Sequence, residues 1–197
     1  MLAEKETPID KARVELRDST YHWLISHCVS HDLGDLIARM LSSRVAGMGD
    51  MPRYLGLSKA AFRQLMEHHF SGLDLQAFDC HGKELDAGRS DEHAELRQLF
   101  VSHADGLPNT TEWVADILVA GCMGGDHLWQ DLGLWSRKDL TALIRTSFAP
   151  LADKNIHDMK WKKFFYKQLC IQEGVYTCRA PSCQVCTDYA ACFGPQE

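Results

Sequence analysis

Apolar residues recur at intervals of three and four positions along almost the whole chain, as they do in helices that bury one face. Leu36, Ile37, Met40 and Leu41, for example, share one face of a helix expected over about residues 33–45. The same pattern predicts further helices over about residues 8–30, 59–70, 90–100, 110–118, 137–148 and 156–173. No stretch alternates apolar and polar residues as a strand would, so we predict an all-α fold of about seven helices.

Residue types that begin helices stand in front of several of these stretches. We expect N-caps at Thr7, Ser58, Asn109, Ser136 and Asn155, with Glu112 and Asp139 completing capping boxes for Asn109 and Ser136. Gly47 and Gly49 follow the second predicted helix, and Gly174 follows the last one. Residues 71–89 lack helical spacing and are expected to be a loop.

Two stretches of the chain resemble each other. LGLSKAAFRQLMEHHF (55–70) aligns with LGLWSRKDLTALIRTSF (132–148) when one residue is inserted, and glycines also match upstream. This similarity predicts a duplicated helix–loop–helix unit, at about residues 36–70 and 113–148, in a pseudo-symmetric helical bundle. Chance similarity between two amphipathic helices is the alternative.

Composition narrows the class of protein. The formal net charge is −6 and hydrophobic residues make up 45% of the 197 positions, so binding to nucleic acid is not expected. The N-terminus MLAEKETPID lacks the apolar core of a secretory signal. The most apolar stretch, residues 113–125, is too short to span a bilayer and contains Asp116. We therefore expect a soluble, cytoplasmic protein, in which clustered cysteines indicate metal binding rather than disulfides.

Four of the eight cysteines lie close together near the C-terminus, as Cys178-x4-Cys183-x2-Cys186-x5-Cys192. Proline, serine, aspartate and glycine are interspersed among them, which favours a loop over a helix or strand. We therefore divide the chain into a helical domain at 1–175 and a cysteine-rich metal-cluster loop at 176–197.

Three chemistries could use these thiols. The first two spacings match those of the plant-type ferredoxin motif, which holds an iron–sulfur cluster. Structural zinc usually takes two cysteine pairs separated by a longer gap, whereas these cysteines form one compact group. The spacing favours a cluster, and a zinc-stabilised helical interaction or regulatory module remains the alternative. An electron-transfer protein would also hold a cluster, but it would keep its metal through reversible reduction.

Two other features could contribute to such a centre. Lys160, Lys163 and Lys167 share a helix face that could stabilise a negatively charged cluster, although a solvated basic face is the commoner explanation. Cys122 and His127 occur only in the second of the two similar interhelix loops. His127 is equally compatible with a histidine that hydrogen-bonds to the backbone. No general acid–base pair can be identified, so the chain is not expected to be an enzyme.

The cysteine spacing, together with MKWKKFFYKQLC (159–170) and DHLWQDLGLWSRKDLTALI (126–144), resembles the NifQ family of nitrogen-fixation proteins. The resemblance is strong in the C-terminal half and looser in the N-terminal half. It implies a carrier that takes molybdenum from a molybdenum source and supplies it for the iron–molybdenum cofactor of nitrogenase.

The same resemblance implies a molybdenum–iron–sulfur cluster, or an iron–sulfur precursor of it, and delivery to the NifEN scaffold together with NifH. It identifies Cys178, Cys183, Cys186 and Cys192 as the ligand positions. Molybdenum at one corner of the cluster would need a ligand other than cysteine, for which His127 or Asp126 is our hypothesis.

Overall fold

The computed structural model of the chain describes residues 7–78, 90–105 and 108–173. Within these ranges the regular structure is helical, apart from one isolated bridge between Cys28 and Phe70, which confirms the all-α prediction. The elements are α1 (Pro8–Ser26), α2 (His31–Val45), η1 (Arg53–Gly56), α3 (Lys59–His69), η2 (Leu75–Phe78), α4 (Ser90–Val101), α5 (Pro108–Cys122), α6 (Leu128–Asp131), α7 (Arg137–Ser147), α8 (Ala149–Ala152) and α9 (Trp161–Glu173). None of the helices described is both long and apolar enough to cross a membrane.

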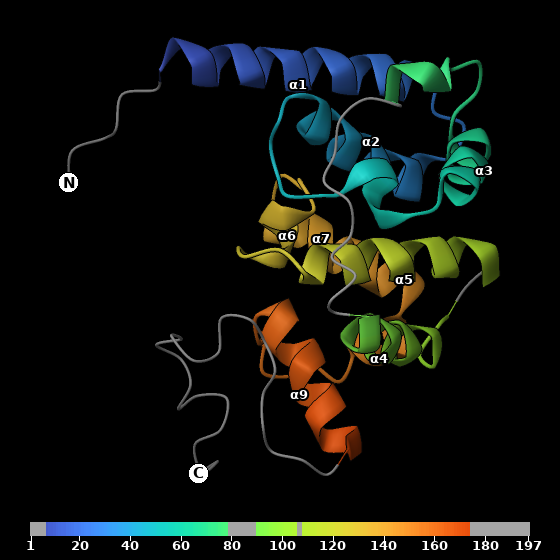
Figure 1. Ribbon diagram of the computed structural model, residues 1–197, viewed down its shortest axis with the longest axis vertical. Helices are drawn as coiled ribbons and strands as arrows, with labels where there is room; N and C mark the ends of the chain where they lie inside the picture. The colour runs from blue at the N-terminus through green and yellow to red at the C-terminus, as the bar shows by residue number, and fades with distance from the viewer. Residues whose placement is uncertain (1–6, 79–89, 106–107, 174–197) are drawn as a thin grey trace.

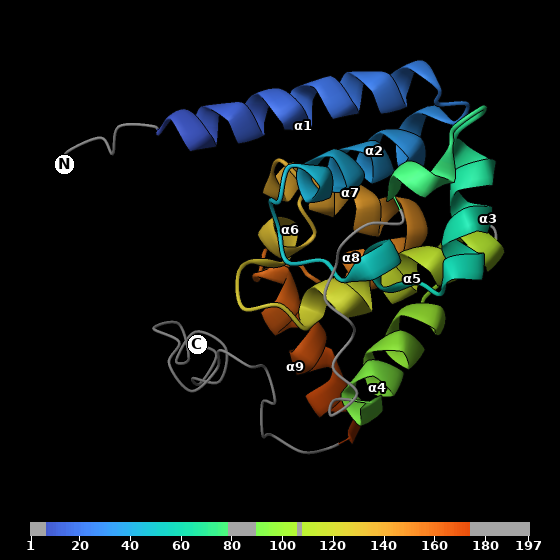
Figure 2. The same ribbon diagram turned by 45° about the horizontal axis from the view of Figure 1, so that its top comes forward.

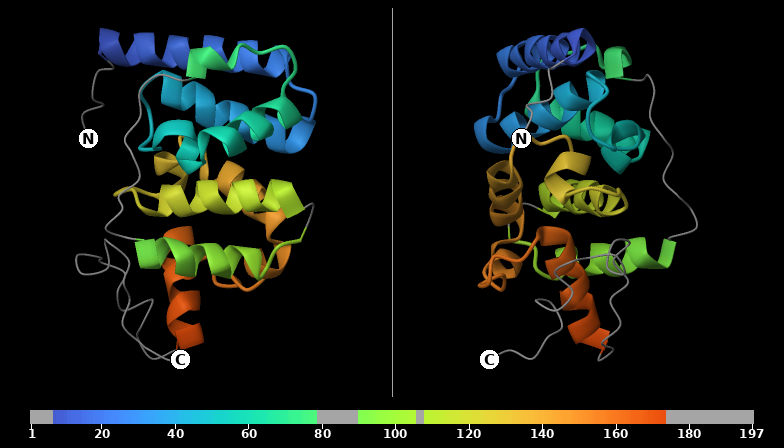
Figure 3. Two further views of the ribbon diagram at one scale, coloured as in Figure 1. Left: turned by 45° about the vertical axis from the view of Figure 1, so that its right-hand side comes forward. Right: turned by 90° about the vertical axis from the view of Figure 1, so that its left-hand side faces the viewer.

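The helices are stacked along the long axis of the molecule (Figures 1 and 3). α1 lies against α2 at one end, α5, α6 and α7 occupy the middle, and α4 and α9 lie at the opposite end. The N-terminal half of α1 extends beyond the helices beneath it (Figure 2).

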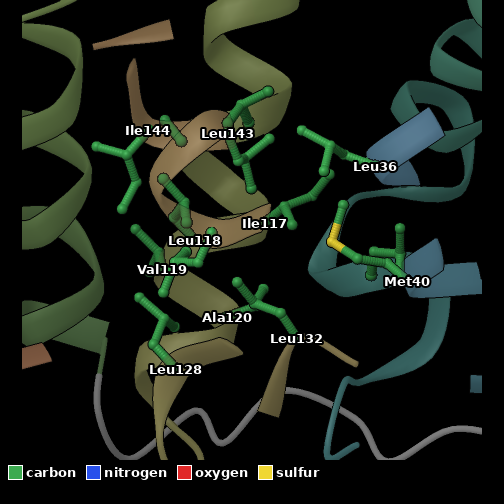
Figure 4. Close-up of a cluster of buried hydrophobic side chains, with 14 of the residues drawn as sticks. Leu36, Met40, Ile117, Leu118, Val119, Ala120, Leu128, Leu132, Leu143 and Ile144 are labelled. Carbon is green, nitrogen blue, oxygen red and sulfur yellow. The ribbon is translucent and has the colours of Figure 1, made fainter. Parts of the chain in front are cut away.

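One apolar core joins the middle of the stack. Leu36 and Met40 of α2 point toward Ile117 of α5 and toward Leu132, which follows α6 (Figure 4). All four side chains are at most 7% exposed. Because each fully buried side chain of this size contributes about 1.5–3 kcal/mol, this cluster ties the two halves of the described chain together.

Two segments of the structure have the same order and lengths of helices. α2 and α5 each have 15 residues, and α3 and α7 each have 11. A short helical turn lies between the long helices of each pair, η1 in the first segment and α6 in the second. Ser58 caps α3 and Ser136 caps α7, each through its side-chain oxygen.

The two segments contact each other through matched glycines. Gly56 has φ +84°, and a Cβ atom there would lie 2.4 Å from the Ala120 Cβ on α5. Gly133 has φ +72°, and a Cβ atom there would lie 2.8 Å from the Ser43 Cβ on α2. Each segment thus places a left-handed glycine, with no room for a side chain, against the long helix of the other segment.

Several predicted helix boundaries are confirmed, because local hydrogen bonds fix them. Thr7 and Asp10 form a capping box at the start of α1, and Ser136 and Asp139 form one at the start of α7. Ser58 accepts a hydrogen bond from Ala61 N–H, at 3.1 Å. These caps need only residues that are neighbours in sequence.

Other predicted boundaries are wrong. α1 ends at Ser26 rather than near residue 30, because the chain turns to pair Cys28 with Phe70. α5 begins at Pro108, so Asn109 lies inside the helix and does not cap it. The last helix begins at Trp161, not after Asn155, whose side chain accepts from Met159 N–H and donates to the Met159 carbonyl oxygen. Two short helices, α6 and α8, and the 3-10 turn η2 in the predicted loop were not expected from the sequence.

His69, at the end of α3, is a polar side chain buried in the N-terminal half. It is 2% exposed, its Nδ1 is hydrogen-bonded with the Ser30 hydroxyl, and its Nε2 has no hydrogen-bond partner in the described part of the chain. Burial, helped by the neighbouring His68, lowers the pKa of His69 to about 4. The folded protein therefore holds this imidazole neutral at pH values where the unfolded chain protonates it.

We predict that His69→Asn reduces the loss of stability in mild acid. Between pH 6.5 and about 4 the unfolded chain binds a proton at His69 that the folded chain does not, so stability falls as the pH falls through this range. Urea unfolding at pH 7 and pH 4.5 should show that the wild type loses up to about 3 kcal/mol more than the variant. His157→Asn, at an exposed histidine, is the control, and equal losses in all three proteins would contradict the assignment.

Candidate metal centre

The four cysteines of the predicted centre, Cys178, Cys183, Cys186 and Cys192, lie outside the described residues. The structure describes the helix that leads to them, α9, and the elements that hold this helix in place. α9 packs beside α4, and the Phe165 ring meets the Phe100 ring edge-on at 4.8 Å between centroids. The body that carries the tail is therefore built from packed apolar side chains.

A buried ion pair anchors the first turn of α9. Lys162 Nζ contacts Asp131 Oδ2 and donates a hydrogen bond of 2.8 Å to the Gly124 carbonyl oxygen. Only 13% of the Lys162 side chain and 2% of the Asp131 side chain are exposed. Burial raises the pKa of the Asp131 carboxyl, and the Lys162 ammonium acts in the opposite direction. One ammonium group thus connects α9 to both α6 and the loop before it.

Asp131 is also the junction of the two interhelix loops. Its Oδ1 accepts from Asp126 N–H at 3.3 Å, within the second loop. Its main-chain carbonyl oxygen accepts from Asp50 N–H at 2.9 Å, in the first loop. The carboxylate and carbonyl of one residue therefore hold three separate parts of the chain in register.

His127 lies in this anchored loop, at the N-cap of α6. Its carbonyl oxygen accepts hydrogen bonds from Gln130 and Asp131 N–H, whereas its imidazole forms no capping hydrogen bond. The residue is exposed, as is its neighbour Asp126. The loop therefore fixes the backbone of His127 and leaves its side chain at the surface, where an imidazole nitrogen can bind a metal.

The structure does not bring the other candidate ligand of this loop to the same place. Cys122 is 0% exposed in the core, at the last residue of α5, while His127 faces solvent. Cys170 is half-buried on α9. In the ranges 7–78, 90–105 and 108–173, no three or more His, Cys, Asp or Glu side chains come together as a metal site.

The predicted lysine face is only partly exposed. Lys160 is exposed, whereas Lys163 and Lys167 are half-buried. Lys162, next to them, forms an ion pair with Asp131. In the sequence, Lys162 is adjacent to the predicted basic face of Lys160, Lys163 and Lys167. Its spacing from Phe165, Tyr166 and Leu169 places it on the buried stripe of α9, and that spacing was the available signal of a buried lysine.

The described body and the sequence beyond it define a class: an all-α protein whose last described helix leads into a cluster of four cysteines. A sequence model of the NifQ family matches residues 36–194, a range that includes all four tail cysteines. No solved structure matches the chain.

Curated relatives agree with the family model. The chain is 39% identical to Protein NifQ of Azotobacter vinelandii over 183 residues, which cover 87% of this chain and 94% of the relative. It is 37% identical to Protein NifQ of Rhodobacter capsulatus, over 83% and 88% of the two chains. It is 36% identical to Protein NifQ of Klebsiella pneumoniae, over 81% and 97%.

The chain belongs to the NifQ family. Members of this family donate molybdenum for biosynthesis of the iron–molybdenum cofactor of nitrogenase, and NifQ is a molybdenum carrier rather than an enzyme. Its partners accordingly belong to nitrogenase cofactor assembly. These results confirm the resemblance and the function that it implied.

We predict that Lys162→Met destabilises the protein by about 3–5 kcal/mol, because it leaves the buried Asp131 carboxylate without its cation. Removing both charges in Lys162→Met/Asp131→Leu should restore part of this loss. Arg145→Met is the matched control, since the Arg145 and Asp153 side chains are 60% and 69% exposed, and it should cost less than about 1 kcal/mol. Urea unfolding measures all three, and a Lys162→Met effect as small as the control would show that the pair does not anchor α9.

Proposed function

We propose that the chain carries molybdenum in an iron–sulfur cluster ligated by Cys178, Cys183, Cys186 and Cys192. The observation that carries this proposal is the presence of four clustered cysteines in a member of the NifQ family, within the range that the family model matches. Thiolates are the soft ligands that iron–sulfur centres require, and the sulfides of such a centre offer bridging ligands to a further metal such as molybdenum. An iron–sulfur cluster that later receives molybdenum is the precursor form of the same cargo.

The described body supports this assignment by offering no competing centre. Between residues 7 and 173 its described side chains form no cluster of three or more potential ligands, whereas four cysteines lie within fifteen positions of one another in the sequence of the tail. We treat residues 1–175 as the helical domain and residues 176–197 as the cargo-carrying segment.

His127 is our candidate for the ligand other than cysteine that molybdenum would need. From Lys162, which binds this loop, α9 carries the chain about 17 Å to Glu173. Cys178 follows five residues later, and five extended residues cover about 17 Å. Covalent geometry therefore allows the first tail cysteine to return to the His127 loop.

For acceptors we propose the NifEN scaffold acting with NifH, in the cytoplasm, where a reducing environment keeps thiolates available for metal. A carrier must release its cargo, whereas an electron-transfer protein must keep it. Transfer of molybdenum from the loaded chain to the acceptor therefore distinguishes a carrier from an electron-transfer protein.

The helical domain itself is best explained by duplication of one helix–loop–helix unit, at about residues 36–70 and 113–148. The equal helix lengths, the serine caps and the reciprocal contacts of Gly56 and Gly133 support this origin. Chance similarity of amphipathic helices does not explain why each glycine meets the long helix of the other unit. Under this proposal, differences between the units mark places where function was added, and the loop that contains His127 is one of them.

Anaerobic purification tests the cluster directly. We expect a brown protein that contains iron, acid-labile sulfide and molybdenum, and we expect serine substitution of any of the four tail cysteines to reduce iron at least several-fold. Circular dichroism should remain nearly unchanged, because the described core ends before the tail. Cys28→Ser, a cysteine of the helical body, is the control and should retain its iron. A colourless wild-type protein that contains zinc would instead favour the zinc-stabilised interaction module.

A second prediction concerns His127. His127→Ala should keep its iron but hold several-fold less molybdenum after loading, because an imidazole nitrogen is replaced by a methyl group at an exposed position. Metal analysis and transfer of molybdenum to NifEN with NifH measure the effect, and His157→Ala, at another exposed histidine, is the control. Unchanged molybdenum content and transfer would remove His127 from the proposed centre.

A further inference from the structure

α1 and α4 occupy corresponding places at the two ends of the stack. α1 packs along α2, and α4 packs along α5, the helix whose length equals that of α2. A Ser–His pair with the same hydrogen bonds closes each outer helix, Ser26–His27 at the end of α1 and Ser102–His103 directly after α4. The His27 Nδ1 lies 2.9 Å from the Trp23 carbonyl oxygen, and the His103 Nδ1 lies 2.9 Å from the Leu99 carbonyl oxygen.

The backbone after these helices also follows the same course. Val29 N–H donates to the His69 carbonyl oxygen at 2.9 Å, and His69 is the last residue of α3. Asp105 N–H donates to the Ser147 carbonyl oxygen at 3.0 Å, and Ser147 is the last residue of α7. Trp23 on α1 therefore corresponds to Leu99 on α4, and Leu16 corresponds to Glu92 seven positions earlier.

The corresponding faces of α1 and α4 differ in the elements that pack against them. On α4, α9 packs against the side that carries Glu92, whose carboxylate accepts a hydrogen bond from the Tyr166 hydroxyl. On α1 no described helix takes the place that α9 has on α4, and Leu16 and Trp23 are 46% and 40% exposed. Ile9, 71% exposed, continues the same stripe one heptad earlier.

We propose that this open face of α1, formed by Ile9, Leu16 and Trp23, is a docking surface for an amphipathic helix of the protein that accepts molybdenum. α9 shows which occupant α4 takes: a helix that contacts α4 through Phe165 and Tyr166. The inference rests on the proposed carrier function and identifies where the acceptor binds.

The size of the face fits a brief contact rather than a stable dimer. Ile9 to Trp23 spans about 21 Å of helix, and a helix laid along it is about 10 Å wide. This footprint falls well short of the roughly 800 Å² per partner of a standard stable interface. A second copy of the chain would therefore be held weakly, whereas short-lived binding suits a carrier that must leave its acceptor.

The proposed docking surface on α1 also lies far from the helix that leads to the cysteine tail. α1 lies at the end of the molecule opposite α9, the helix that precedes the cysteine tail (Figure 1). An acceptor helix bound along α1 would leave the α9 end uncovered. Substitutions on α1 should therefore change binding of the acceptor without changing the metal content.

The test compares metal-loaded full-length Leu16→Glu with the wild type, with Leu16→Met and with the control Ile156→Glu, whose isoleucine is 78% exposed in a different part of the surface. Iron, molybdenum and helicity should be equal in all four proteins. Affinity for the NifEN scaffold, measured by biolayer interferometry, should fall at least tenfold for Leu16→Glu alone. A photo-crosslinking benzoylphenylalanine at position 16 should attach to an amphipathic helix of the scaffold. Trp23 is left in place because it stacks on Phe78 and supports the fold.

Three results would overturn the inference. Wild-type affinity in Leu16→Glu would show that α1 is not the docking surface, while the carrier function stands. A wild-type dimer that Leu16→Glu dissociates would show that a second copy covers the face. A wild type that carries metal but neither binds nor supplies NifEN would refute the proposed acceptor, and the docking inference with it.

Discussion

Asp131 is the residue on which the arrangement around the proposed centre depends. Its buried carboxylate holds Lys162 of α9 and the backbone of Asp126, and its carbonyl oxygen holds Asp50. A buried ion pair seldom adds much net stability, because desolvation of both charges opposes their attraction. The contribution of this pair is geometric: the Lys162 ammonium and the N–H groups of Asp126 and Asp50 all bind Asp131, so the positions of the two loops and of α9 are coupled. The helix that leads to the cysteines is thereby fixed relative to the loop that contains His127.

The two similar segments of the helical body differ at a few places, and these differences can be compared directly. Gly56 and Gly133 make reciprocal contacts, so each segment packs against the long helix of the other in the same way. The second loop is bound by Lys162 and places His127 at the surface. α9 packs against α4, whereas no described helix takes the corresponding place on α1. All of these differences involve α9. α9, which follows the second segment, therefore both leads to the cysteine tail and accounts for these differences between the two segments.

The sequence predicted the helical class and those helix ends that local hydrogen bonds determine, such as Thr7 and Ser136. It failed at Asn109 and Asn155, because an asparagine can cap a helix, lie within its first turn or close a separate turn, and distant packing decides among these. The Lys162–Asp131 pair joins residues that are distant in sequence, and neither has a local signature stronger than its spacing on a buried stripe. For the cysteine tail the situation is reversed: the sequence alone indicates metal chemistry, whereas the tail lies outside the described residues.

X-ray absorption at the iron and molybdenum edges of the anaerobically loaded wild-type chain tests the central claim most directly. If the tail thiolates hold a mixed-metal cluster, iron should be surrounded by sulfur, and molybdenum should have both sulfur neighbours and iron at the short distance of a shared sulfide bridge. Iron coordinated only by oxygen and nitrogen, or molybdenum bound without any iron neighbour, would contradict the account.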